Sequence, residues 1–257
     1  MALSRNINAY SHEQGSSYFW ISPWPPRKKR PRALSARMEA SLPERLVIDP
    51  RTATFDDLAP AARVLLEGGL VAGPTDTFYA IMALVDNHEA LNTVMRLKGE
   101  EERQNKPSLI LLDQEPRVRC YAREVPEEAE GLMESFWPGP LTLLFLAHTG
   151  LHQCLVGPAR TVGLRVEGMP SVRKLVRMVD RGLTGTSANR SGGEPATTAD
   201  QVIEVFGDDL AMVIDGGPTA GGSPSTIIDV SLGVPRVLRD GGLPMSSLKQ
   251  ACPILRF

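Results

Sequence analysis

Residues 183–192 read LTGTSANRSG, and this stretch joins an apolar run of strand length to a polar loop. A helix is expected to follow from about Thr198. Hydroxyls, an amide and a glycine between a strand and a helix suit a phosphate group or a nucleobase edge, because they offer donors and close backbone approach. A polar connection ending in a helix N-cap at Thr197 or Thr198 is the simpler alternative. The stretch predicts a strand, a loop and a helix, with a candidate nucleotide contact in the loop.

The alternation of strands and helices continues outward on both sides of this unit. Helical apolar periodicity occurs at 88–98, 125–136 and 172–179. Strand-length apolar runs occur at 69–73, 108–112, 141–147, 161–166, 183–187, 211–215, 226–230 and 235–239. Three of these runs follow one another late in the chain without a helix, which favours a mixed sheet. The pattern predicts an α/β fold, with a single domain built on a twisted mixed sheet of parallel and antiparallel strands that helices cover.

Composition narrows the class of protein. The chain is 42% hydrophobic and 23% charged, as in an ordinary globular protein, and no apolar run reaches the roughly 20 residues that a bilayer crossing needs. The three cysteines are odd in number and far apart, which favours neither a disulfide framework nor a zinc site. We therefore expect a soluble, cytoplasmic protein without a membrane partner.

The N-terminal segment differs in composition from the rest of the chain. It holds SPWPP at 22–26 and the basic run RKKRPR at 27–32, without a periodic apolar pattern. We expect a disordered extension over 1–44, a folded domain over 45–250 and a C-terminal tail over 251–257. The basic run suits a nucleic-acid arm, a targeting element or a solvated tail, and Met38 is an alternative start of the protein.

Net charge argues against non-specific nucleic-acid binding by the body of the chain. Residues 1–37 hold seven Lys or Arg against one acidic residue, so residues 38–257 carry a net charge of −8. Binding to a polynucleotide depends on Lys and Arg neutralising phosphates. A polynucleotide role would therefore need a local basic patch.

Three motifs place polar groups beside predicted strands and helices. PTDTFYA at 74–80 ends an apolar run, at the strand edge where open α/β sheets bind ligands, although it also fits a simple proline-initiated turn. Lys98 falls on the apolar face of the 88–98 helix, so its amine either reaches solvent or faces a ligand. WPGPLT at 137–142 forms a rigid turn that would present the Thr142 hydroxyl.

Two arginines end predicted strands near hydroxyl-bearing loops. Arg165 lies in GLRV and Arg239 in VLRDGG, while STIID begins with Ser225. A lone arginine more often forms a surface ion pair, but two at strand ends favour convergence on an anion. The sequence has no P-loop, no dinucleotide-binding glycine motif, no zinc-protease motif and no serine-hydrolase elbow.

In this order the motifs PTDTFYA, KG at 98–99, WPGPLT, GLRV, TSANRSG, STIID and VLRDGG resemble the YrdC-type threonylcarbamoyl-AMP synthase family over residues 45–250. The resemblance implies a YrdC-like catalytic domain and a nucleotidyltransferase that makes threonylcarbamoyl-AMP and pyrophosphate from L-threonine, bicarbonate and ATP. Mg²⁺ would be carried by ATP, with no metal held by the protein alone. The product would serve N6-threonylcarbamoyladenosine modification of tRNA through partner proteins.

The resemblance also assigns roles to single residues. Thr75 and Ser225 would contact threonine, with Arg165 as a carboxylate partner. The catalytic residues would be Lys98 and Arg239. ATP would be held by Lys98, Thr142, Ser187, Asn189, Thr197 and Arg239.

The chain departs from the family pattern at two places. The family has an arginine two residues after the lysine and a proline soon after, whereas Lys98-Gly99 is followed by EEER and Pro107 comes later, so Arg103 is a candidate replacement. Ala80 stands where the family usually has glycine. The alternative hypothesis is an RNA-binding YrdC-like protein with altered or lost synthase activity, in which the basic run would contact tRNA or other RNA. By length the chain resembles the family's short form, without a C-terminal extension.

Overall fold

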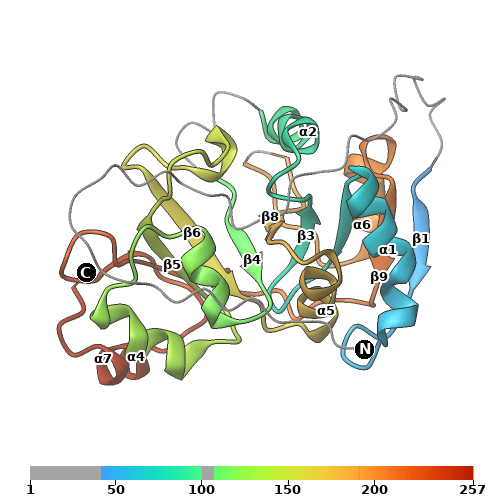
Figure 1. Cartoon of the computed structure of the whole chain (residues 1–257). Coiled ribbons are helices and arrows are strands. Elements are labelled where there is room, and N and C mark those ends of the chain that lie inside the picture. The colour runs from blue at the N-terminus through green and yellow to red at the C-terminus, as the bar shows by residue number, and fades with distance from the viewer. Residues whose placement is uncertain (1–41, 100–106, 191, 257) are drawn as a thin grey trace, which may run out of the picture. The chain divides into compact units, whose positions relative to one another are not determined.

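The computed structural model describes residues 42–99, 107–190 and 192–256 (Figure 1). All of these residues belong to one compact unit of the chain. The extension predicted over 1–44 lies outside the described residues as far as residue 41, and a strand begins at Glu44, the last residue of that range. The basic run at 27–32 and Arg103 also lie outside the described residues.

A five-stranded sheet carries one end of the candidate site. Its strands, in spatial order, are β1 (Glu44–Val47), β9 (Met212–Asp215), β2 (Val71–Pro74), β3 (Tyr79–Met82) and β8 (Thr186–Ser187). β1 and β2 both run parallel to β9, so the loops that follow these three strands leave the sheet at the same edge. β3 pairs antiparallel with β2 and with β8.

A six-stranded sheet carries the rest of the candidate site. Its strands, in spatial order, are β11 (Arg236–Arg239), β10 (Thr226–Asp229), β5 (Leu141–Leu146), β6 (Thr161–Val166), β4 (Ile110–Leu112) and β7 (Leu183–Thr184). β10 is parallel to β5 and β4 is parallel to β6, whereas β5 and β6 are antiparallel. The predicted mixed α/β class is therefore confirmed, and every predicted strand run contains a strand.

The predicted single sheet is divided by its hydrogen bonds into two. The run at 183–187 breaks at Gly185, so that β7 pairs with β4 and β8 pairs with β3. A Cβ at Gly185 would lie 2.7 Å from Leu111 Cγ, which explains why a glycine stands at this crossing. An isolated bridge between Leu84 and Leu183 joins the two sheets at the same point.

Helices cover both faces of the five-stranded sheet. α1 (Phe55–Glu67) and α5 (Pro170–Val179) contribute to one hydrophobic cluster with Val71 and Met212. α2 (His88–Lys98) and α6 (Ala199–Phe206) contribute to a second cluster with Ala72 and Val213, the neighbours that point to the opposite face. α4 (Glu127–Phe136) and α7 (Met245–Ala251) contact each other, as Figure 1 shows.

Short 3-10 helices connect several of these elements. They are η1 (Glu115–Cys120), η2 (Gln153–Leu155) and η3 (Gly207–Asp209). Among the described residues, no helix is both long and apolar enough to cross a membrane.

The C-terminal residues do not form a separate tail. Cys252 and Leu255 are buried. Arg256 donates its backbone N–H to the carbonyl of Pro235 at 2.9 Å and accepts one from Val237 at 2.8 Å. The fold therefore continues past the boundary predicted at residue 250, because the chain end adds a short parallel contact to the edge of β11.

Sequence analysis did not identify α1. Substitutions of its adjacent residues Leu65 and Leu66 test whether this helix packs as described. Leu65 is fully buried and Leu66 is exposed. We expect Leu65→Ala to lower the free energy of unfolding by about 2–5 kcal/mol, because it leaves a cavity in the core. Leu66→Ala should cost less than about 1 kcal/mol in the same urea titration. Equal losses would contradict the assigned face of α1.

Candidate active site

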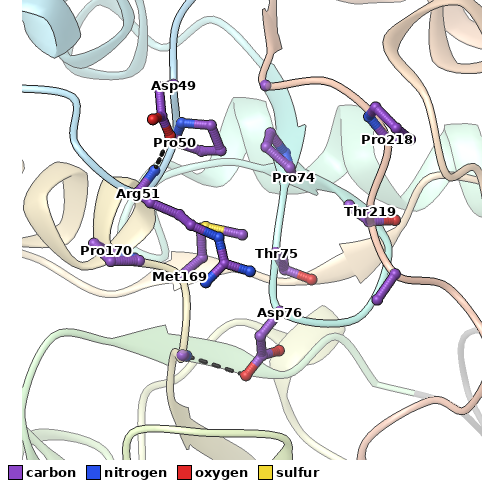
Figure 2. A pocket seen from close by; sticks show the side chains of 13 residues that line it. Asp49, Pro50, Arg51, Pro74, Thr75, Asp76, Met169, Pro170, Pro218 and Thr219 are labelled. Atoms are coloured by element: carbon purple, nitrogen blue, oxygen red, sulfur yellow. Dashed lines mark hydrogen bonds between the residues drawn. The ribbon is translucent and has the colours of Figure 1, made fainter.

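A small cavity lies at the edge where β1, β2 and β9 end (Figure 2). Its volume is about 230 Å³, and it is lined by residues from 49–51, 74–76, 168–170 and 216–220. The carboxyl edge of parallel strands is the usual ligand-binding edge of an open α/β sheet. A cavity of this size accepts a small molecule or one end of a larger one, since drug-sized ligands occupy about 300–1,000 Å³.

Thr75 shapes the turn between β2 and β3. Its hydroxyl donates to the carbonyl of Phe78 at 2.7 Å and accepts the backbone N–H of Thr77 at 3.2 Å and of Phe78 at 3.3 Å. The turn that we predicted as an alternative for 74–80 is thus present. Asp76 takes part in a longer-range contact, because one of its carboxylate oxygens accepts the backbone N–H of Gly168 at 3.2 Å.

Arg165 is buried behind this turn, between two carboxylates. Its Nη2 contacts Asp76 Oδ1 and lies 2.8 Å from Glu167 Oε2. These are ion pairs by distance and do not align as hydrogen bonds. In the described part of the chain, Arg165 Nε also has no hydrogen-bond partner, although it is buried. That donor would suit a ligand oxygen. Contact between Arg165 and the carboxylate of threonine stays a prediction.

Lys98 is held by the loop that follows β8. Its Nζ donates to the carbonyl of Ser187 at 2.9 Å, the carbonyl of Asn189 at 2.5 Å and Asn189 Oδ1 at 2.9 Å. The Ser187 hydroxyl donates to the same Oδ1 at 2.6 Å. Three residues assigned to ATP therefore meet, and the amine of Lys98 faces the loop rather than reaching away from it.

Thr142, Ser225 and Arg239 form a second cluster. The hydroxyls of Thr142 and Ser225 are 2.9 Å apart and both residues are buried. Arg239 donates from Nε and Nη2 to the carbonyl of Ser225 at 3.0 and 2.9 Å, and from Nη2 to its hydroxyl at 3.0 Å. The parallel pairing of β10 with β5 produces this contact, since Thr226 lies opposite Leu141.

Arg239 and Arg165 are close enough for their charges to interact. Loss of hydration around the Arg239 guanidinium lowers its pKa, and the positive charge of Arg165 lowers it further. Like charges repel each other, and a bound anion would relieve the repulsion. Convergence of the two strand-end arginines on an anion stays a prediction.

Thr197 lies between the helix α6 and the loop that lines the cavity. Its N–H and hydroxyl donate to Gln201 Oε1 at 2.8 and 3.2 Å, and its carbonyl accepts the N–H of Thr219 at 2.9 Å. Thr198 is the N-cap of α6. The predicted cap is therefore present at Thr198, while an ATP contact at Thr197 stays a prediction.

Sequence analysis missed several residues of this site. Arg51 points its side chain toward Thr75 in the cavity, as Figure 2 shows, but it follows a strand too short and exposed to give an apolar pattern. Glu167 follows Arg165 by two residues, and a charged residue just after a buried strand was a readable signal.

Tyr79 donates its hydroxyl to the carbonyl of Gly217 at 2.7 Å, and burial raises its pKa to about 12, so the donor stays protonated.

The fold and these clusters define a mixed α/β protein with fixed cations and hydroxyls at its strand ends. Residues 63–241 match the family model of Sua5, YciO and YrdC proteins, whose description is "Telomere recombination". This match covers more than half of the chain. The chain belongs to the Sua5/YciO/YrdC family.

Curated relatives in this family carry the name of one enzyme. The chain is 35% identical, over 77% of its length, to threonylcarbamoyl-AMP synthase of Pyrococcus abyssi, and the match covers 57% of that protein. It is 32% identical, over 74% of its length, to a putative threonylcarbamoyl-AMP synthase of Mycobacterium tuberculosis, with 90% of that protein covered. The chain thus spans less than three fifths of the P. abyssi relative.

Solved structures agree on the fold. A crystal structure of P. abyssi Sua5 complexed with L-threonine matches with a TM-score of 0.76 and 31% identity, over 84% of this chain and 62% of that chain. Escherichia coli YciO matches with a TM-score of 0.73, over 80% of this chain and 100% of that chain. At 20% identity, the second likeness shows the fold alone.

Substitutions of two adjacent glycines after β11 test how closely this loop packs against the backbone around Ser225. A Cβ at Gly241 would lie 2.4 Å from the backbone nitrogen of Thr226, whereas a Cβ at Gly242 has no neighbour nearer than 3.8 Å. We expect Gly241→Ala to lower the free energy of unfolding by about 1–3 kcal/mol, because the backbone must shift to admit the methyl group. Gly242→Ala should leave the denaturation midpoint nearly unchanged. A tolerated Gly241→Ala would argue against the described packing of this loop.

Proposed function

We propose that this domain is an L-threonylcarbamoyladenylate synthase, a nucleotidyltransferase that uses L-threonine, bicarbonate and ATP. The observation that carries the proposal is the fixed amine of Lys98 on the hydroxyl and amide loop at 187–189. An ammonium group held beside hydrogen-bonding groups is a suitable partner for nucleotide phosphates. Membership in the family and the names of its curated relatives support the same assignment.

The chemistry asks for positioning and charge stabilisation rather than for a covalent nucleophile. Threonine and bicarbonate would first form a carbamate with loss of water. An oxygen of that carbamate would then attack the α-phosphate of ATP, and pyrophosphate would leave. Fixed cations stabilise the charge that develops on the phosphate oxygens. In the proposal Lys98 and Arg239 supply those charges, and Thr142, Ser187, Asn189 and Thr197 help to orient the nucleotide.

The threonine end of the reaction would use the region around Thr75, Ser225 and Arg165. The buried Nε of Arg165 is a donor without a hydrogen-bond partner among the described residues, which suits a carboxylate. The likeness to the P. abyssi structure with L-threonine supports threonine as the amino acid.

Magnesium enters the proposal only as an ion carried by ATP. Within the described ranges, no group of three or more His, Cys, Asp or Glu residues is arranged to hold a metal ion. The polar groups near the proposed ATP residues are cations, hydroxyls and carbonyls, so the phosphates themselves would ligate the Mg²⁺ ion. The bound Mg²⁺ ion would neutralise part of the phosphate charge.

We further propose that the product passes to separate proteins that modify tRNA adenosine to N6-threonylcarbamoyladenosine in the cytoplasm. Such a transfer suits a short-lived mixed anhydride, which reacts best when it is handed directly to its acceptor. RNA contact through the basic run at 27–32 belongs to the alternative hypothesis, in which synthase activity is altered or lost.

The direct test is pyrophosphate release by the full chain with Mg²⁺. We expect release from ATP that requires both L-threonine and bicarbonate, since the carbamate is the nucleophile. Mixtures that omit one of the two substrates are the controls. Release that is the same without threonine, or none at all, would refute the synthase assignment.

Lys98 should matter more than another lysine of the chain. We expect Lys98→Ala to lower kcat/KM for ATP by about 100-fold, the usual effect of removing one electrostatic contact to developing charge. Lys249→Ala is the matched control, because Lys249 is an exposed residue of α7. Equal effects of the two variants would remove Lys98 from the proposed phosphate site.

A further inference from the structure

Glu167 is a fully buried carboxylate that contacts three separate segments. One oxygen, Oε1, accepts the backbone N–H of Asp76 at 2.9 Å and of Met169 at 3.2 Å. The other, Oε2, lies 2.8 Å from Nη2 of Arg165. The side chain therefore joins the turn after β2, the strand β6 and the loop between β6 and α5.

Two of the residues that Glu167 contacts line the cavity. Asp76 and Met169 both line it, from different loops, as Figure 2 shows. Glu167 holds the backbone of both, so it fixes the spacing of the two walls. The loop itself is fixed from the other side, because Arg173 Nη1 donates to the carbonyls of Glu167 at 2.6 Å and Gly168 at 2.7 Å.

The third contact controls how Arg165 presents its donors. Asp76 and Glu167 both meet the same Nη2, so the guanidinium is held between two negative charges. A guanidinium held in this way cannot rotate freely, and its Nε stays buried without a hydrogen-bond partner in the described ranges. The direction of that free donor is therefore set by the two carboxylates.

We propose that Glu167 is a positioning residue of the amino-acid site. It does not touch the substrate; it fixes the Arg165 guanidinium and the Thr75–Asp76 turn in the arrangement that recognises the amino acid. This inference rests on the proposed function, because it concerns recognition of the threonine substrate.

Glu167→Gln is the first variant. The amide oxygen of glutamine still accepts the two backbone N–H groups, while the charge beside Arg165 is lost. We expect the KM for L-threonine to rise by about tenfold or more, because a displaced Arg165 would lose its proposed hydrogen bond to the threonine carboxylate, a bond to a charged group. The KM for ATP should stay within about twofold and kcat should change less than the threonine KM, as expected when a binding contact is lost.

Asp113→Asn is the matched control. Asp113 is also buried and pairs with two arginines, Arg117 at 2.5 Å and Arg177 at 3.4 Å, and none of the three lines the cavity. Its loss should lower stability without raising the threonine KM. An unchanged threonine KM in Glu167→Gln, or an equal rise in both variants, would overturn the inference, because a structural role alone would then explain the effect.

Direct binding of L-threonine by calorimetry separates this inference from the proposed function. If the wild-type chain releases no pyrophosphate, the proposed function fails, whatever the variants do. If the wild type turns over and Glu167→Gln binds threonine as tightly as the wild type, only the inference fails. Should Glu167→Gln not fold, Glu167→Asp keeps the charge on a shorter side chain, and an unchanged threonine affinity in that variant would also overturn it.

Discussion

The candidate site depends on one buried ion cluster, formed by Arg165 with Asp76 and Glu167. A guanidinium taken out of water must be paired, and removing one partner of a buried pair typically costs about 3–5 kcal/mol. Arg165 belongs to the six-stranded sheet, whereas Asp76 belongs to the turn at the end of the five-stranded sheet. The requirement to pair this charge therefore fixes the edge of one sheet against the other, and the cavity forms at that junction.

Oxygen atoms of loops orient Lys98 and Arg239, the two cations assigned to the phosphates. Lys98 is fixed by carbonyl and amide oxygens, and Arg239 by the carbonyl and hydroxyl of Ser225. The neutral oxygens of Ser225 orient the Arg239 guanidinium without cancelling its charge, so that charge stays available for an anion. Arg165 differs, because two carboxylates lie beside its Nη2, while its buried Nε has no hydrogen-bond partner among the described residues and could serve a ligand. This division suits a reaction in which phosphates and a small amino acid bind at neighbouring places.

The two sheets meet where the side chains of Leu109 and Leu111 leave little room for another side chain. Gly185 lies between β7 and β8, and the strand changes sheets at this residue. A methyl group there would lie 2.7 Å from Leu111 Cγ, so the leucine side chains would have to shift to admit a residue other than glycine. Because β8 leads directly into the loop that holds Lys98, the same crossing that links the sheets also positions one of the fixed cations.

The sequence by itself determined the class of fold and most of the candidate residues. Apolar runs of strand length reveal buried strands such as β5 and β6, and the ordered polar motifs indicated the loops at their ends. It could not reveal β1, whose residues are mostly exposed, or the role of Arg51, which follows that strand. The pairing of Arg165 with Asp76 was also beyond it, because an ion pair between residues about ninety positions apart leaves no periodic pattern in the chain. Only the tertiary structure brings Asp76 to Arg165 and divides the strands into two sheets, since long-range packing and the pairing of buried charge decide both.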